Sequence, residues 1–182
     1  MSAFYSGNYK NAFLEAQRDY DIAQANNISY QEGRSMNIMA ACHLMNGNID
    51  EGYSCFKKSY HIFKESGNHL FMWRPSFNIG QIYYRRGKVS KALMHYQKFL
   101  QNEITNISER LPNLMLSNSE MVCLIYIARI LRKNGKYKEA DALYEKYKNP
   151  CFEYCYNISD EEFESVLSKL HYIHNGFIII LG

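Results

Sequence analysis

The sequence predicts an all-α protein built as a solenoid of repeated helix pairs. Apolar residues recur at helical spacing along nearly the whole chain, and alternating strand patterns are scarce. Only three prolines occur in 182 residues, so long stretches are free of helix breakers. A short glycine motif also recurs at a nearly constant interval, which is typical of solenoid proteins.

The recurring motif reads glycine, polar, apolar, two polar residues and a small residue. It occurs at Gly7–Ala12, Gly47–Gly52, Gly87–Ala92 and Gly135–Ala140, and successive glycines lie 40, 40 and 48 residues apart. Glycine just after a helix adopts the left-handed conformation without a steric penalty. The small residue that ends the motif lets the second helix approach the first. Each motif therefore predicts a joint between two antiparallel helices.

A phosphate-binding loop is the competing interpretation of the segment from Gly80 to Ser90. Such a loop has four residues between its first glycine and a Gly-Lys pair, followed directly by Ser or Thr. Here six residues separate Gly80 from Gly87-Lys88, and Val89 comes next. The spacing excludes the loop and favours the helix joint.

The joints divide the chain into a partial first repeat and a complete second one. About one helical turn precedes Gly7, and the second helix of this repeat is expected from Tyr9 to Ala25. We expect the chain to begin inside a longer solenoid or to present an uncapped end. The second repeat is expected from Tyr30 to Ser66, with Gly67 as its stop.

The third repeat is expected from Met72 to Asn102, with Pro75 in its first turn, where a missing N–H costs nothing. A looser segment is expected from Thr105 to Ser117. The fourth repeat is expected from Ser119 to Lys148, and Pro150 closes it.

A capping box, Ser159 to Glu162, predicts the start of a last helix that caps the solenoid. Its apolar face would hold Phe163, Val166, Leu167, Leu170 and Ile173. The apolar tail Phe177–Leu181 is too short to span a membrane, and it is expected either to pack on the last repeat or to be the start of a larger segment. A homodimer contact through this tail is a further expectation. We assign residues 1–150 to the repeats and 151–182 to the capping helix and tail, within one domain.

Small residues also lie seven positions before three of the joint glycines, at Ala40, Gly80 and Ala128. With Asn78-Ile79-Gly80, Tyr83, Gly87, Ala92 and Tyr96, this pattern resembles the tetratricopeptide repeat. The basic unit of that family has about 34 residues. The longer spacing here is similar to that of bacterial sensor-regulators of the maltose-activator kind, quorum-peptide receptors and cell-polarity scaffolds. The resemblance covers residues 1–150 and implies a right-handed α-solenoid that binds other molecules.

Composition excludes several classes of protein. The formal charge of +3 is too small to indicate nucleic-acid binding, and no apolar stretch reaches the roughly 18 residues of a membrane span. The N-terminus lacks the layout of a signal peptide. Of five cysteines, Cys42, Cys55 and Cys123 fall within apolar helical patterns, which suits reduced thiols. We therefore expect a cytoplasmic protein without membrane or nucleic-acid partners.

Catalytic and metal-binding motifs are also weak. Neither a Gly-x-Ser-x-Gly nor a His-Glu-x-x-His motif occurs, so we expect no enzyme activity and no cofactor. Cys151, Cys155, His171 and His174 resemble a zinc set, but the histidine spacing is tighter than usual. We expect no metal there.

The resemblance implies a ligand groove lined by the first helix of each pair. The predicted groove residues are Arg34, Asn37, Arg74, Phe77, Asn78, Gln81, Tyr84, Arg85, Arg129 and Arg132. Arginine pairs with carboxylates in a two-point fashion, and Asn and Gln amides pair with a peptide backbone. This combination predicts a scaffold or sensor module of a bacterial regulatory protein that binds an acidic peptide or partner segment. The alternative is the repeat arm of a larger ATPase or transcriptional regulator that senses a small anionic molecule.

Overall fold

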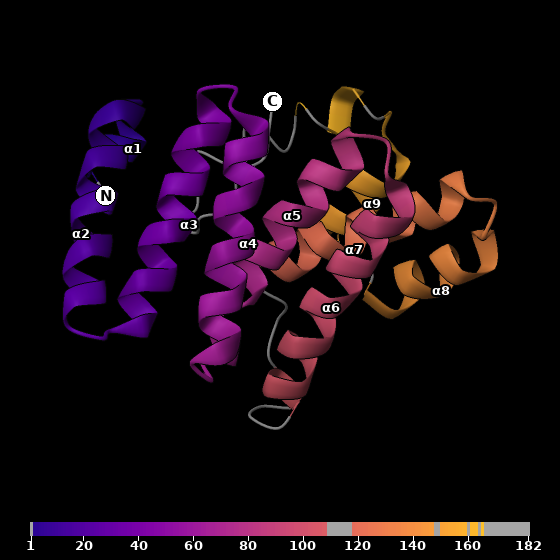
Figure 1. Cartoon of the computed structure of the whole chain (residues 1–182). Coiled ribbons are helices and arrows are strands. Elements are labelled where there is room, and N and C mark those ends of the chain that lie inside the picture. Colours follow the sequence, from indigo (N-terminus) through magenta and orange to yellow (C-terminus); the bar gives the residue numbers. More distant parts are fainter. Residues whose placement is uncertain (1, 109–117, 148–149, 160, 164, 166–182) are drawn as a thin grey trace.

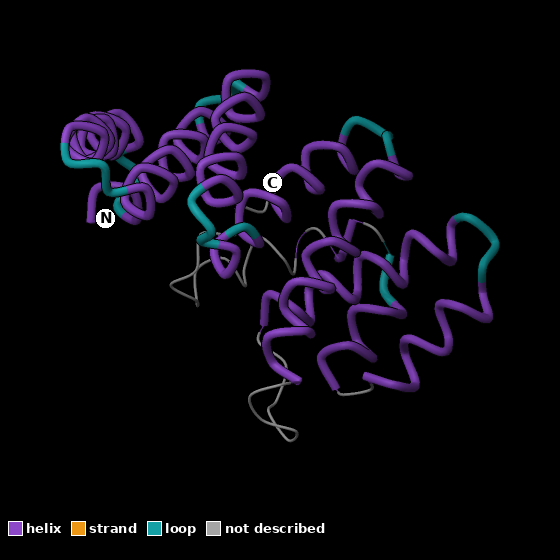
Figure 2. The backbone as a smooth tube through the Cα atoms, turned by 60° about the horizontal axis from the view of Figure 1, so that its bottom comes forward, coloured by secondary structure: helices purple, strands orange, loops and turns teal. Residues whose placement is uncertain are grey.

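The computed structural model describes residues 2–108, 118–147, 150–159, 161–163 and 165, and these residues contain helices but no strand (Figure 1). The helices are α1 Ser2–Tyr5, α2 Tyr9–Ala25, α3 Ser29–Met45, α4 Ile49–Glu65, α5 Trp73–Arg85, α6 Val89–Ser108, α7 Asn118–Lys133, α8 Tyr137–Tyr147 and α9 Pro150–Asn157. A short 3₁₀ helix, η1 (His69–Phe71), precedes α5. Helices α1 to α8 pack mainly on their neighbours in the chain, and α9 packs on both α7 and α8, so the fold is an array of stacked antiparallel pairs (Figure 2).

The predicted glycine joints are confirmed, and Gly87 shows how they work. Its φ of +67° is left-handed, and its N–H donates to the Tyr84 carbonyl at 3.0 Å. The next N–H, of Lys88, donates to the Tyr83 carbonyl at 2.9 Å. This pair of bonds ends α5 and turns the chain into α6, as expected for a Schellman-type cap.

Close helix approach at the small residues is also confirmed. A Cβ built on Gly80 would lie 2.7 Å from the Tyr96 ring, and one on Gly52 would lie 2.7 Å from the Leu44 side chain. Ala92 and Ala140, which occupy the position of Gly52 in later pairs, are fully buried. These contacts explain why the motif carries a small residue at that position.

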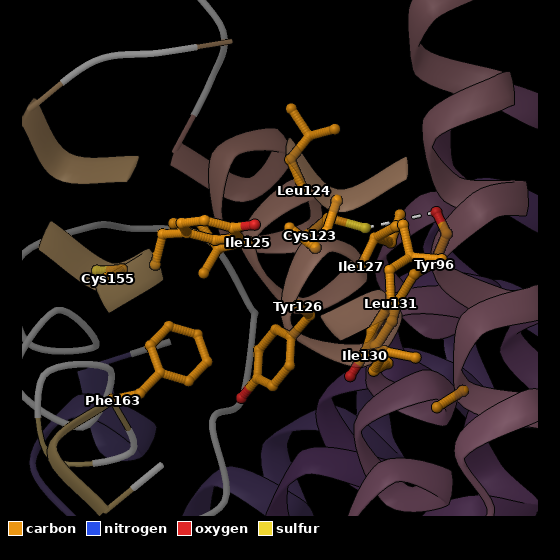
Figure 3. Close-up of a cluster of buried hydrophobic side chains, with 14 of the residues drawn as sticks. Tyr96, Cys123, Leu124, Ile125, Tyr126, Ile127, Ile130, Leu131, Cys155 and Phe163 are labelled. Atoms are coloured by element: carbon orange, nitrogen blue, oxygen red, sulfur yellow. Dashed lines mark hydrogen bonds between the residues drawn. The ribbon is translucent and has the colours of Figure 1, made fainter. Parts of the chain in front are cut away.

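Two hydrophobic clusters form the core, and α5 belongs to both. Ile79 and Ile82 pack with residues of α1 to α4, while Phe77 packs with residues of α6 to α9. In the second cluster Tyr126 lies between Phe163 and Tyr96, with ring centroids 5.0 and 5.3 Å away (Figure 3). The α5 helix therefore joins the two halves of the array.

The fold differs from the sequence-based expectation at two places. Helix α6 continues to Ser108, past Thr105, because no helix breaker occurs before Pro112. Pro150 begins α9, a helix that the sequence analysis did not predict, although proline is well suited to a first helical turn. Part of the expected loose segment, residues 109–117, lies outside the described residues.

The capping box is confirmed. The Ser159 N–H donates to Glu162 Oε2 at 3.0 Å, and the Glu162 N–H donates to Ser159 Oγ at 3.2 Å. Phe163 is buried, as expected for the apolar face that follows. The rest of that face and the tail Phe177–Leu181 lie outside the described residues. Among the described residues, no helix is long and apolar enough to cross a membrane.

Candidate functional site

Three of the predicted groove residues meet in one small pocket. Arg34 and Asn37 of α3 and Arg74 of α5 line it, and we call it the arginine pocket. Three aromatic side chains complete it, namely Tyr30, Phe63 and Phe71. Arg34 and Arg74 lie 40 residues apart at the same position of successive repeats, which is why both reach the same pocket.

The aromatic wall comes from α3, α4 and η1. The ring centroids of Tyr30 and Phe71 lie 4.5 Å apart, and those of Phe63 and Phe71 lie 5.8 Å apart. Gly33 permits this packing, because a Cβ there would lie 2.6 Å from the Phe63 ring. None of these three aromatic residues was among the predicted groove residues. Phe63 and Phe71 lie in α4 and η1, outside the first helices of the pairs, whereas Tyr30 lies in the first turn of α3. Phe63 and Phe71 lie four residues before and after Gly67, and this placement beside a helix end could have indicated that they meet.

The polar chemistry of the pocket combines positive charge with a buried acceptor. Asn37 is 3% exposed, and its Oδ1 accepts no hydrogen bond from the part of the chain that the structure describes. Arg34 and Arg74 are half-buried, and the Arg74 guanidinium lies 4.9 Å from the centre of the Trp73 ring. The pocket volume is about 10 Å³, enough for one water molecule.

Phe77 does not line a groove, which corrects the prediction. It is fully buried, with its ring centroid 5.5 Å from that of Tyr96 and 6.4 Å from that of Tyr126. Helices α6 and α7 both contribute to this cluster, so this side of α5 faces the core.

Asn78 and Gln81 are each only 1% exposed, so neither presents an open polar surface. Both polar atoms of the Gln81 amide lack hydrogen-bond partners among the described residues. A buried, unpaired amide of this kind costs stability. Both residues belong to the predicted groove set of α5, but neighbouring parts of the fold cover them.

Tyr84 and Arg85 lie near the end of α5. Tyr84 is half-buried, accepts a hydrogen bond from Lys133 Nζ at 3.2 Å, and contacts the Tyr126 ring edge-on at 5.2 Å. Arg85 is exposed. The Tyr84–Lys133 contact links the ends of α5 and α7.

Arg129 acts as a bridge within the fold, which corrects its assignment to an open groove. It is 7% exposed, and its Nη1 donates to the carbonyls of Cys155 at 2.8 Å and Ile158 at 2.9 Å. Its guanidinium also lies 4.5 Å from the centre of the Phe163 ring. The residue thus ties α9 and the segment after it to α7.

Arg132 is exposed and lines a second, larger hollow with Arg129. Its guanidinium lies 4.7 Å from the centre of the Tyr156 ring, and Nη1 donates to the Tyr156 carbonyl at 3.3 Å. The hollow has a volume of about 200 Å³ and is lined by Arg129, Arg132, Lys133, Tyr156, Asn157 and Ile158. The predicted groove residues therefore divide among the arginine pocket, the larger hollow and a buried set, while Tyr84 and Arg85 line neither hollow.

The buried thiol of Cys42 and the grouping of His, Cys, Asp and Glu side chains bear on nucleophilic and metal chemistry. Burial raises the pKa of the Cys42 thiol to about 11, so it stays protonated at neutral pH and is a poor nucleophile. No three His, Cys, Asp or Glu side chains within the described parts of the chain could share a metal ion. Cys155 is buried, whereas His171 and His174 lie outside the described residues.

Comparisons with known proteins agree with the repeat architecture. Residues 31–102, which cover α3 to α5 and most of α6, match the tetratricopeptide repeat family. A crystal structure of the nearly identical TPR-like repeats of a protein assigned as a kinesin light chain from Podosopora anserina is similar, with a TM-score of 0.64 and 15% identity. The match covers 94% of this chain and 90% of that one.

A single-substitution variant of the same fungal repeats gives a TM-score of 0.63 at 15% identity, covering 94% of this chain and 89% of that one. At this identity the likeness shows the fold alone. No curated protein matches the chain in sequence. The fold is an all-helical array of tetratricopeptide-like helix pairs.

Proposed function

We propose that the chain is a protein-binding scaffold that holds an acidic segment of a partner at the arginine pocket. Tetratricopeptide repeats are generally scaffolds for protein–protein interaction. The observation that carries the proposal is the convergence of Arg34 and Arg74, from successive repeats, on one pocket with the buried acceptor of Asn37.

The chemistry of this pocket favours a carboxylate next to an apolar group. Each guanidinium offers five N–H donors in a planar fork, which matches a carboxylate. Asn37 Oδ1 can accept a hydrogen bond from an N–H of the ligand, and the aromatic wall can pack against its apolar atoms. The small volume means that a carboxylate enters only when the long arginine side chains move outward.

The wider biological role is also a proposal. A sensor role in a bacterial regulatory protein is suggested by the repeat length of about 40 residues. The alternative, a repeat arm of a larger ATPase or transcriptional regulator that senses a small anion, is favoured by the second, roomier basic hollow. A homodimer contact through the tail Phe177–Leu181 remains a prediction.

A peptide array tests the scaffold proposal directly. The full chain would be probed against peptides rich in Asp, Glu and aromatic residues, each paired with a copy in which the acids are replaced by amides. We expect the wild-type chain to bind acidic peptides and not their amide copies. The double variant Arg34→Gln/Arg74→Gln should no longer bind the acidic peptides. The Arg18→Gln variant, which removes an exposed charge on α2, serves as a control and should bind normally. Equal binding to both peptide sets would contradict the proposal.

A further inference from the structure

The hollow between α7 and the α9 region concentrates positive charge. Among the six described residues that line it, Arg129, Arg132 and Lys133 are cationic and none is acidic. The hollow's volume of about 200 Å³ is far larger than the 10 Å³ of the arginine pocket, which has room for one water molecule.

The three cations lie on one face of α7. Positions 129, 132 and 133 have the i, i+3, i+4 spacing that brings side chains together on a helix, and like charges at this spacing repel each other. The helix dipole favours the two cations in the last turn of α7. It does not explain why all three border the same hollow.

Existing contacts orient these side chains. Arg129 is anchored by the carbonyls of Cys155 and Ile158, and the Arg132 guanidinium is stacked on the Tyr156 ring. Lys133 Nζ donates to the Tyr84 hydroxyl. The Tyr156 hydroxyl donates to Asp141 at 2.9 Å, and Asp141 does not line the hollow.

We propose that this hollow binds a phosphoryl group. Arg132 would supply a two-point fork to two of its oxygens, and Lys133 would supply a compact charge to a third. Asn157 Nδ2, also part of the lining, donates to the Glu153 carbonyl at 2.9 Å, and its second N–H could serve as a neutral donor. Arg129 Nη1 already donates to the Cys155 and Ile158 carbonyls. Arg129 would therefore contribute mainly by its charge and by holding the α9 region in place beside α7.

A phosphoryl group fits better than a single carboxylate because its charge is larger. A phosphate monoester carries about −1.5 to −2 charges at pH 7 and three acceptor oxygens, so it can pair with both Arg132 and Lys133. Its source could be a free phosphorylated metabolite or a phosphorylated side chain, and these share the same chemistry. The hollow shares no lining residue with the arginine pocket, so phosphoryl binding here can be tested independently of the proposed scaffold function.

The test is a titration of the isotope-labelled full chain with inorganic phosphate, O-phosphoserine and acetate, followed by NMR. We expect saturable shifts for residues 132–136 and 155–159 with both phosphoryl compounds, and weaker binding of acetate. Tighter binding of O-phosphoserine than of phosphate would indicate a phosphorylated side chain as the source. Equal binding would indicate a free phosphorylated compound.

Variants separate specific binding from general attraction. Arg132→Gln and Lys133→Gln should each weaken phosphate binding about tenfold or more, the expected effect of losing one charge-assisted hydrogen bond. Lys138→Gln removes the same charge from an exposed position of α8 that does not line the hollow, and it should bind as the wild type does. Shifts that never saturate, or equal weakening by all three variants, would overturn the proposal.

Discussion

Tyr96 of α6 lies directly against the Cα of Gly80 in α5, so that a Cβ at residue 80 would be only 2.7 Å from Tyr96 Cε1. Tyr96 is fully buried and its ring is stacked on Tyr126, so it has little room to move. The α5–α6 pair therefore depends on the absence of a side chain at this point.

Gly80→Leu should destabilise the protein by about 1–3 kcal/mol or more, because the added side chain overpacks the α5–α6 contact. Thermal unfolding followed by circular dichroism would measure the effect. Ser54→Leu, at an exposed position of α4, adds a similar side chain away from any helix contact and should leave the melting temperature nearly unchanged. An unaltered melting temperature for Gly80→Leu would contradict the packing described for this pair.

Gly87→Ala should destabilise the protein for a different reason. No atom lies within 4 Å of a Cβ at this position, but its φ of +67° is unfavourable for residues with a side chain. We expect a loss of about 1–2 kcal/mol from the backbone alone. Gly87→Asn should cost less, because Asn tolerates the left-handed conformation better than Ala does. Urea unfolding curves of the two variants would check the order.

Arg129→Met should loosen the attachment of the α9 region to α7. The variant leaves the Cys155 and Ile158 carbonyls without their charged donor, and hydrogen bonds to charged groups contribute about 1.5–3 kcal/mol each. Amide hydrogen exchange should accelerate most in residues 150–163. Arg132→Met loses a 3.3 Å hydrogen bond and a ring contact of an exposed side chain, and it should have a smaller effect. Uniform acceleration along the whole chain would show that Arg129 is not a local bridge.

Stability should fall with acid because of His95. Burial lowers its pKa from 6.5 to about 4, with a further contribution from Lys98. The unfolded chain therefore binds a proton between pH 6.5 and 4 that the folded chain does not, and stability declines as the pH falls through this range. Since the side chain is partly exposed, the contribution is on the order of 1 kcal/mol. The difference in unfolding free energy between the wild type and His95→Gln should change with pH between 4 and 6.5 and become constant above pH 7 if the pKa is the cause.

For a ligand of the arginine pocket, Arg74→Ala should reduce affinity by roughly 2–5 kcal/mol, as the loss of a desolvated charge contact does. Binding should also weaken as salt rises, because added salt screens the charges of exposed groups. Asn78→Ala should instead lower stability, since Asn78 is enclosed by the fold rather than open to a ligand. Calorimetric titration and thermal unfolding of both variants would separate the two effects. Normal binding by Arg74→Ala, without salt dependence, would place the ligand site elsewhere.

The sequence by itself determined the local units of this protein. Glycines such as Gly87 mark helix ends because only they adopt a left-handed backbone at low cost, and the Ser159–Glu162 box is formed by residues three positions apart. The 40-residue interval placed Arg34 and Arg74 at equivalent positions, and both line one pocket. These features depend on short-range geometry or on the repeat itself.

The tertiary structure decided which residues of each helix remain available. Phe77 and Arg34 both belonged to the predicted groove, yet α6 and α7 cover Phe77 while Arg34 borders a pocket. Arg129 became a bridge because the α9 region, some 26 to 29 residues further along the chain, places its carbonyls beside it. Helical periodicity identifies the apolar and polar sides of a helix, but burial depends on which distant segment packs there, and that partner is set only when the whole chain folds.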